Sequence, residues 1–275
     1  MDPADAIIFD NSFNESLDEV ALPGGTRWLT FGRLFNQSLE RVALPSGLFG
    51  IDLGINFNQS LEKVSLPSSI REMKLSLYFD QSLEKVALPS SLIILSFGAR
   101  FDQDMEKVEF PAGLRSLEFG SCFNQSLQKV ALPSSLQVLS FSGRFNQDMV
   151  GWRFPQGLEK LAIVHSSFNL RLDRVALPPL LVELTLRGAF NKPLKNVALP
   201  SSLQSLKLTG RFNQPLEHVA FPQTLQVLII QGYFNRSFEK VALPDSLQNL
   251  TLSRWYDQSM EKVNLPQACA VHYES

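Results

Sequence analysis

Residues 199–221, LPSSLQSLKLTGRFNQPLEHVAF, decide the fold of this chain. They contain the pattern L-x-x-L-x-L at Leu203, Leu206 and Leu208, which is typical of a strand entering one coil of a leucine-rich solenoid. Leu206 and Leu208 lie two residues apart and point to one face of an extended segment, while Lys207 points to the other. One short coil cannot bury its apolar side chains alone, so neighbouring copies must pack against it.

The same coil recurs along the chain at a fixed period. An aromatic residue returns every 22 residues, at Phe13, Phe35, Phe57, Phe79, Phe101, Phe123, Phe145, Phe168, Phe190, Phe212, Phe234 and Tyr256. A one-residue insertion near 166 is the only break in this period. The sequence therefore predicts a single repeat domain over 1–275 with about twelve coils.

These positions predict a leucine-rich-repeat-like right-handed solenoid. One parallel β-sheet is expected on the concave side, built from the L-x-x-L-x-L segments. The return path, with Phe212, Leu216 and Val219 pointing inward, is expected to form loops and turns of polyproline II or 3-10 type on the convex side. Little or no α-helix is expected.

A polar residue follows the recurring aromatic in every coil. It is asparagine at Asn14, Asn36, Asn58, Asn124, Asn146, Asn169, Asn191, Asn213 and Asn235. A buried amide can satisfy both donors and acceptors of the backbone, so stacked coils should form an asparagine ladder. Asp80, Asp102 and Asp257 replace it in three coils, where the ladder is expected to be less completely bonded.

The unit at 199–221 closely resembles the FNIP repeat, a short leucine-rich-repeat variant. The Leu199-Pro200 step, the L-x-x-L-x-L strand and the run Phe212 to Leu216 carry the resemblance, which covers essentially the whole chain. Most coils have serine where Pro193 and Pro215 keep the proline of the family pattern. The resemblance implies a non-catalytic recognition scaffold, and it transfers no catalytic residue and no cofactor.

Charge and hydropathy exclude several partners. The formal net charge is −2 and 19% of residues are charged, with both signs interleaved as in Glu62-Lys63 and Glu84-Lys85, so no basic footprint for nucleic acid is present. Those Glu-Lys pairs are expected to form a solvated lateral or convex surface. No apolar run approaches the length of a membrane span.

Variable positions predict where a protein partner of unknown identity binds. The residue between the two inward strand positions changes from coil to coil, for example Asp52, Lys74 and Ile229. The residue before the recurring aromatic changes as well, and aromatic and arginine side chains are the commonest interface anchors. The candidate contacts are Tyr78, Arg100, Arg144, Arg211, Tyr233 and Trp255. The alternative is unconstrained variation on an edge.

Two adjacent irregularities lie mid-chain. Trp152 replaces the usual valine, and the inserted residue follows around His165 to Ser167. Together they could form a pocket or bulge for a partner, or Trp152 simply fills the valine position. His165, His218 and His272 share no zinc-ligand spacing, so no metal site is predicted.

The favoured function is a binding module that uses outward residues of the concave sheet. The alternative is a structural spacer or assembly element from a longer array. No nucleophile, phosphate loop or unique carboxylate pair is recognisable, so no enzyme and no cofactor are predicted. A regular ice- or glycan-binding face is disfavoured because Asp52, Lys74 and Glu118 break its regularity.

The two ends and the compartment give further expectations. The first coil is expected to be exposed, covered by Met1 to Asp5, or packed end to end against another copy. In the last coil, His272 and Glu274 are expected at inward positions as a weak polar cap. Of the six N-x-S/T sequons, five use ladder asparagines expected to be buried (Asn14, Asn36, Asn58, Asn124 and Asn235); the sixth is Asn249. We therefore expect a cytoplasmic or nuclear protein that is not secreted.

Overall fold

The computed structural model describes residues 5–274. It divides into two compact units, Met1–Leu136 and Gln137–Ser275, and each is a stack of coils with parallel strands. The single domain expected over 1–275 stays a prediction. The expected cover by Met1 to Asp5 falls mostly on residues outside the described range.

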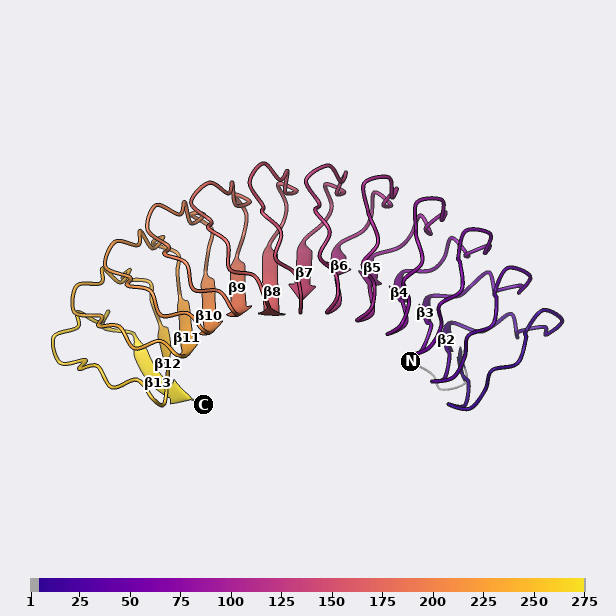
Figure 1. The fold of residues 1–275 in the computed structure, drawn as a ribbon, viewed down its shortest axis with the longest axis horizontal. Coiled ribbons are helices and arrows are strands. Elements are labelled where there is room, and N and C mark those ends of the chain that lie inside the picture. Colours follow the sequence, from indigo (N-terminus) through magenta and orange to yellow (C-terminus); the bar gives the residue numbers. More distant parts are fainter. Residues whose placement is uncertain (1–4, 275) are drawn as a thin grey trace. The chain divides into compact units, whose positions relative to one another are not determined.

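The first unit contains six short strands. They are β1 (Ala6–Ile8), β2 (Trp28–Thr30), β3 (Gly50–Asp52), β4 (Glu72–Lys74), β5 (Ile94–Ser96) and β6 (Ser116–Glu118). Each has three residues, and successive strands from β1 to β6 pair in parallel (Figure 1). This order follows from the repeat, because each coil returns the chain beside its own start.

The second unit contains seven strands, most of them longer. They are β7 (Val138–Ser142), β8 (Lys160–Ser166), β9 (Glu183–Gly188), β10 (Ser205–Gly210), β11 (Val227–Gly232), β12 (Asn249–Ser253) and β13 (Ala270–Glu274). Neighbours are again parallel, and equivalent leucines such as Leu206 and Leu228 stand side by side.

Turns return the chain between strands. In one coil Val219 N–H donates to Leu216 O at 3.0 Å, and Leu225 N–H donates to Pro222 O at 3.1 Å. Within each unit the strands lie on the inner side and these turns on the outer side (Figure 1). The predicted solenoid with a parallel sheet and no α-helix is confirmed for residues 5–274. Nor does that range hold any helix with the length and hydropathy needed to span a bilayer.

Stacked aromatic rings fill the coils. Phe212 is fully buried and lies between Phe190 and Phe234, with ring centroids 6.0 Å apart on both sides and ring planes within 10° of parallel. Leu206 and Leu208 complete the same layer with no exposed surface. Removing one such phenylalanine side chain would cost about 3–5 kcal/mol, so the recurring aromatic stabilises each coil through its neighbours.

The ladder is present, but each rung uses only the side-chain oxygen, as a hydrogen-bond acceptor. Asn213 N–H donates to Asn191 Oδ1 at 2.9 Å, and Gln214 Nε2 donates to the same oxygen at 3.0 Å. Asp80 does the same work, accepting from Asp102 N–H at 3.0 Å and from a glutamine at 2.9 Å. The expectation that aspartate coils bond less completely is wrong, because the rung needs only an acceptor. The ladder residues are also half-buried or exposed rather than buried.

The last coil differs from its expected register. Val271 pairs with Leu250 and Tyr273 pairs with Leu252, so these two residues take the inward positions. His272 therefore aligns with the outward Thr251, and both His272 and Glu274 are exposed. The expected polar cap is wrong because this coil has lost one residue just before its strand, which shifts every later side chain to the other face.

The two mid-chain irregularities have separate structural outcomes. Trp152 is 5% exposed and meets Phe141 and Phe145 edge-on, with both ring centroids at 6.0 Å, so it fills the valine position. The inserted residue forms a β-bulge between Ile163 and Ser166, where His165 has a φ of 49°. The bulge absorbs the insertion, and the β9 pairing continues beyond it.

Candidate functional site: a hollow on the sheet of the second unit

The second unit has an outward row of side chains that the first unit lacks. In the first unit the position two residues after the outward mid-strand residue is glycine in four of six coils, with Asp10 and Ser76 in the other two. A Cβ built on Gly98 would lie 1.8 Å from Ser76 O. The coils that carry glycine at this position therefore have no room for a side chain there. In the second unit the same position is Ser142, Val164, Arg187, Thr209, Gln231 and Ser253.

A shift of glycine by one residue makes this row possible. Gly188, Gly210 and Gly232 end their strands, pair with one another in register, and have φ values of 119°, 96° and 89°. A Cβ on Gly210 would lie 2.6 Å from Gly188 O. Because the tight backbone approach now falls on the glycine, the residue before it stays in the strand and points outward.

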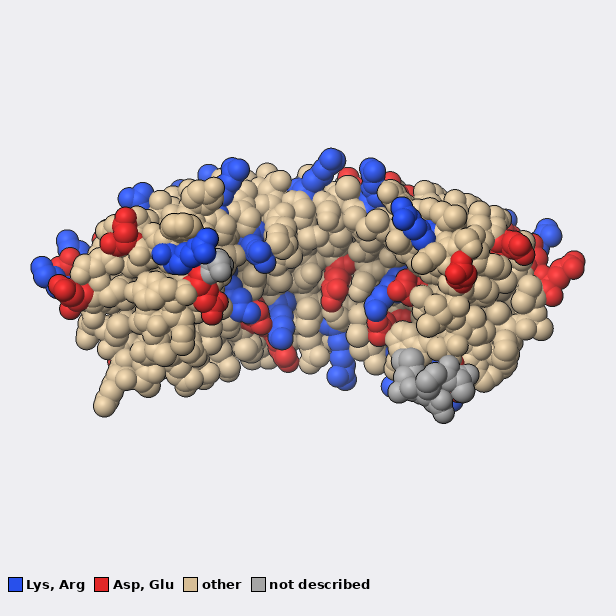
Figure 2. Space-filling view, turned by 90° about the horizontal axis from the view of Figure 1, so that it is seen from below, with Lys and Arg blue, Asp and Glu red and all other residues tan. Residues whose placement is uncertain are grey.

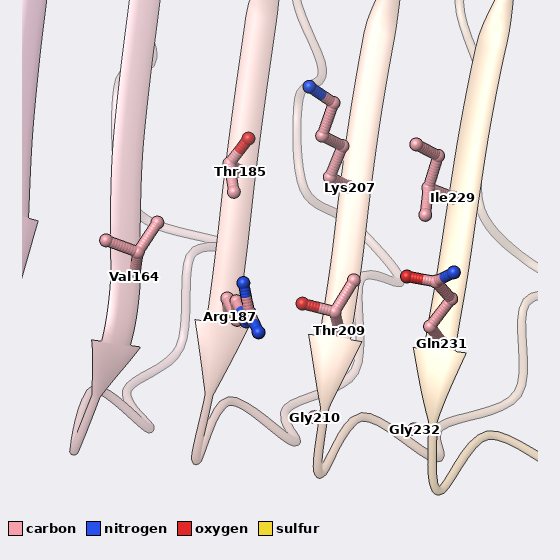
Figure 3. Close-up of a pocket in the computed structure, with 9 residues that line it drawn as sticks. All are labelled: Val164, Thr185, Arg187, Lys207, Thr209, Gly210, Ile229, Gln231 and Gly232. Atoms are coloured by element: carbon pink, nitrogen blue, oxygen red, sulfur yellow. The ribbon is translucent and has the colours of Figure 1, made fainter. Parts of the chain in front are cut away.

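The new row and the mid-strand row together line a hollow, which we call the sheet hollow. Its side chains come from β8 to β11, and Figure 3 shows them as two rows across the strands. They are Thr185, Lys207 and Ile229 in one row and Val164, Arg187, Thr209 and Gln231 in the other, with Gly210 and Gly232 at the strand ends. The hollow measures about 500 Å³, within the usual range of ligand pockets.

Of the basic side chains beside the sheet hollow, two lysines form ion pairs within the described residues and one arginine does not. Lys207 Nζ lies 2.7 Å from Glu183 Oε1, and Lys160 Nζ lies 3.8 Å from the other oxygen of that carboxylate. The hydrogen bond from Lys207 lowers the pKa of Glu183, and burial partly opposes it. Arg187 is exposed and has no ion pair within residues 5–274. The Thr209 hydroxyl is shielded from solvent and has no hydrogen-bond partner there.

The six predicted contact residues lie beside the sheet rather than on it. Each occupies the turn after its strand, and they fall in two groups: Tyr78 and Arg100 in the first unit, and Arg144, Arg211, Tyr233 and Trp255 in the second. Tyr233 and Trp255 are 74% and 72% exposed, so they present large aromatic surfaces. Arg211 directly follows Gly210 and thus borders the sheet hollow. Partner binding by these six residues stays a prediction.

Sequence reasoning missed the row of Arg187, Thr209 and Gln231. The signal is the length of the segment before glycine: LTFG at 29–32 becomes LTLRG at 184–188 and LKLTG at 206–210. With one added residue before the glycine, the strand is longer and carries one more outward side chain.

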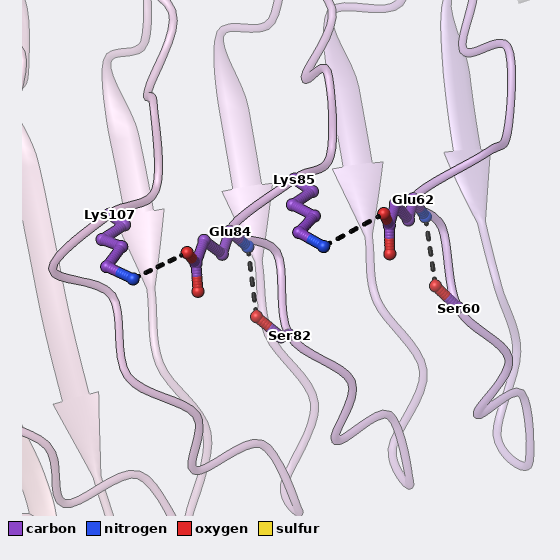
Figure 4. A network of polar contacts seen from close by, with 6 residues as sticks. All are labelled: Ser60, Glu62, Ser82, Glu84, Lys85 and Lys107. Carbon is purple, nitrogen blue, oxygen red and sulfur yellow. Dashed lines mark hydrogen bonds and ion pairs between the residues drawn. The ribbon is translucent and has the colours of Figure 1, made fainter.

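The Glu-Lys positions form pairs between successive coils on the outer turns. Lys107 Nζ lies 2.9 Å from Glu84 Oε1 and Lys85 Nζ lies 3.6 Å from Glu62 Oε1 (Figure 4). The lysine side chains are 72% and 71% exposed, so each pair contributes little to stability. Figure 2 shows that basic and acidic side chains are also mixed on the face seen there, without a continuous field of one sign.

The second unit has a further hollow, and the described chain has two free thiols. This second hollow, beside Asp148 and Val150, contains Arg171, but its guanidinium already bonds both oxygens of Asp173 at 2.9 Å. Within residues 5–274 no three His, Cys, Asp or Glu side chains gather as metal ligands, and Cys122 and Cys269 are free thiols.

The family model of the FNIP repeat matches this chain in six segments. They are residues 35–78, 79–122, 101–144, 123–156, 190–233 and 234–270. The chain belongs to the FNIP repeat family. The matched segments lie in both units and include β10 and β11, two of the four strands that line the sheet hollow.

Solved structures support the same architecture. CroV588, described as a novel circular LRR protein, is 35% identical over 98% of this chain, with a TM-score of 0.87. The chain spans 40% of the length of CroV588. An internalin (inlF) from Listeria monocytogenes is 12% identical over 98% of this chain and 86% of its own, with a TM-score of 0.62, and shows the fold alone. A search of curated protein sequences gives no match.

Proposed function

We propose that this FNIP repeat chain is a non-catalytic recognition scaffold that binds a protein partner through outward side chains of its parallel sheet. The supporting observation is the additional row of Arg187, Thr209 and Gln231. Coil packing does not require this row, since four of the six coils of the first unit stack with glycine there. Side chains released from packing are where repeat proteins vary their contacts.

Affinity capture from native lysate with three variants of the full chain tests this proposal. One variant carries alanine at Thr185, Arg187, Thr209 and Gln231, and another carries alanine at Tyr78, Arg144, Arg211 and Tyr233. The control replaces the paired outer lysines Lys63, Lys85, Lys107 and Lys129. We expect a partner retained by the control and lost by the first variant. Equal capture by all three variants would contradict a sheet-face scaffold.

A spacer or assembly element is the second candidate, favoured by the open final coil. Tyr273 takes an inward position in β13 yet is 51% exposed, and β13 is the last strand of its sheet. Such an edge suits end-to-end association with another copy or with a further coil. Light scattering over a range of concentrations tests the first option, and a constant monomer mass would remove it.

We also propose a cytoplasmic or nuclear location. A glycan on Asn36 or Asn58 would add bulk at a rung whose oxygen bonds the next coil at 2.8 and 2.9 Å. Intact mass of native material is expected to equal the unmodified chain. A mass increment of glycans on these asparagines would contradict the proposed location.

A further inference from the structure

The Arg187 guanidinium is the unmatched charge of the sheet hollow. Its neighbours Lys160 and Lys207 share the carboxylate of Glu183, which contacts both of them. The other members of the Arg187 row on β8, β10 and β11 are valine, threonine and glutamine, so no acid faces it from the adjoining strands. Glu274 on β13 is the nearest acid of that row and is engaged by Gln231 Nε2 at 3.4 Å.

The hydroxyl of Thr209 is the second unsatisfied group, and it stands beside the first. Thr209 pairs in register with Arg187 on the neighbouring strand, and Figure 3 shows its oxygen pointing toward Arg187. A shielded hydroxyl with neither donor nor acceptor partner is costly unless something completes it. A carboxylate can do so once rotation about the Thr209 Cα–Cβ bond turns the hydroxyl into the hollow, because one oxygen then accepts from guanidinium N–H groups while the other accepts from the hydroxyl.

We propose that the sheet hollow binds an acidic segment of a partner protein, with one Asp or Glu carboxylate seated between Arg187 and Thr209. This inference rests on the scaffold function proposed above. Val164 on β8 and Ile229 on β11 stand at opposite ends of the two rows and are half-buried, which suits apolar residues flanking the acid. Lys207 and Lys160 add positive charge that Glu183 only partly offsets, so the acidic segment is attracted along the strands as well.

A protein segment fits this surface better than a nucleic acid does. A nucleic acid would require a row of cations matched to successive phosphates, whereas Glu159 and Glu183 lie on neighbouring strands or just before them. The whole chain is slightly acidic, with a formal net charge of −2. One unmatched arginine beside one unmatched hydroxyl corresponds to a single carboxylate.

Selection of displayed random peptides on the immobilised full chain tests the inference. Parallel selections use Arg187→Ala and the control Arg153→Ala, which removes the same charge from an exposed outer position of the same unit. We expect wild type and Arg153→Ala to enrich peptides containing Asp or Glu, and Arg187→Ala to lose that enrichment. The exposed position of Arg187 predicts unchanged folding, which the unfolding midpoint checks.

Calorimetry with the best peptide then locates the carboxylate. Arg187→Ala is expected to weaken binding by about ten- to a hundredfold, and replacing the peptide acid by its amide should cause a similar loss. The two losses should not add, because both remove one contact. Thr209→Val should weaken binding less than Arg187→Ala does, and Arg187→Lys should restore only part of the affinity.

Three outcomes would overturn the inference. Enriched peptides without Asp or Glu whose binding depends on Thr185 and Ile229 would refute the acidic ligand and leave the scaffold function intact. No enrichment, or enrichment insensitive to every substitution in the sheet hollow, would refute both. A labelled oligothymidine could bind more tightly than the selected peptides and lose that binding in Arg187→Ala. The occupant of the sheet hollow would then be a nucleic acid and not a protein segment.

Discussion

The ladder offers a sharp test because one side-chain atom does its work. Asn191 Oδ1 accepts from Asn213 N–H at 2.9 Å and from Gln214 Nε2 at 3.0 Å, and the Asn191 amide nitrogen has no partner in the described chain. Asn191→Ala removes the acceptor for both donors. Asn191→Asp keeps it, as Asp102 does in accepting from Asn124 N–H at 2.8 Å.

The size of the effect follows from which donor is left without a partner. The donor of Gln214 is a side-chain amide at a half-buried site, so it can rotate and donate to water instead. The Asn213 N–H cannot, because the backbone fixes it between two coils. An unsatisfied, partly buried N–H costs about 1–2 kcal/mol. We therefore expect Asn191→Ala to lose about that much, and Asn191→Asp to stay within about 0.5 kcal/mol of wild type because its carboxylate still accepts.

Urea unfolding of the three proteins at neutral pH gives the free energies, and amide exchange at Asn213 shows whether the loss is local. Asn191→Ala should speed exchange at Asn213, and Asn191→Asp should not. If Asn191→Asp were as destabilising as Asn191→Ala, the amide nitrogen would have to contribute, and the acceptor-only account of the ladder would be wrong.

Three further predictions follow from the packing. Gly210→Ala should destabilise the chain by about 2–4 kcal/mol in urea unfolding, since its φ of 96° and the 2.6 Å approach to Gly188 O leave no room for a methyl group, whereas Thr209→Ala should be nearly neutral. Lys107→Ala should not move the unfolding midpoint, because its ion pair with Glu84 is exposed. Burial, and then the charge of Tyr273, raise the pKa of Tyr256 from 10.0 to about 12. The neutral phenol is thus favoured by folding, its stabilisation is complete below pH 10 and lost as pH rises to about 12, and Tyr256→Phe should abolish the late phase of phenol absorbance.

Much of the fold could be predicted because the inward positions of successive coils carry the same kind of side chain, an apolar one. Leu206, Leu208 and Phe212 are fully buried, and spacing alone placed them on one side of the coil. The role of Trp152 was predictable for the same reason, because the valine position admits a larger apolar ring when neighbours yield. Periodicity reports packing, and these are packing positions.

The site was harder to predict because it depends on where glycine stands within a strand end. Arg187 looks like an ordinary loop residue until Gly188 is known to take the left-handed φ and pair with Gly210. The inward positions of Val271 and Tyr273 were missed for a related reason. One deleted residue reverses every later side chain, and no composition signal marks such a deletion.

The bulge at Ile163 and Ser166 bears on how such chains change over time. An added residue there leaves the pairing of Leu161 with Leu184 and of Ser166 with Gly188 undisturbed. Strand ends beside the glycine are therefore places where length varies without cost to the stack. Each repeat can gain or lose one exposed side chain there, so the contact surface can change one coil at a time while the buried core of the array stays the same.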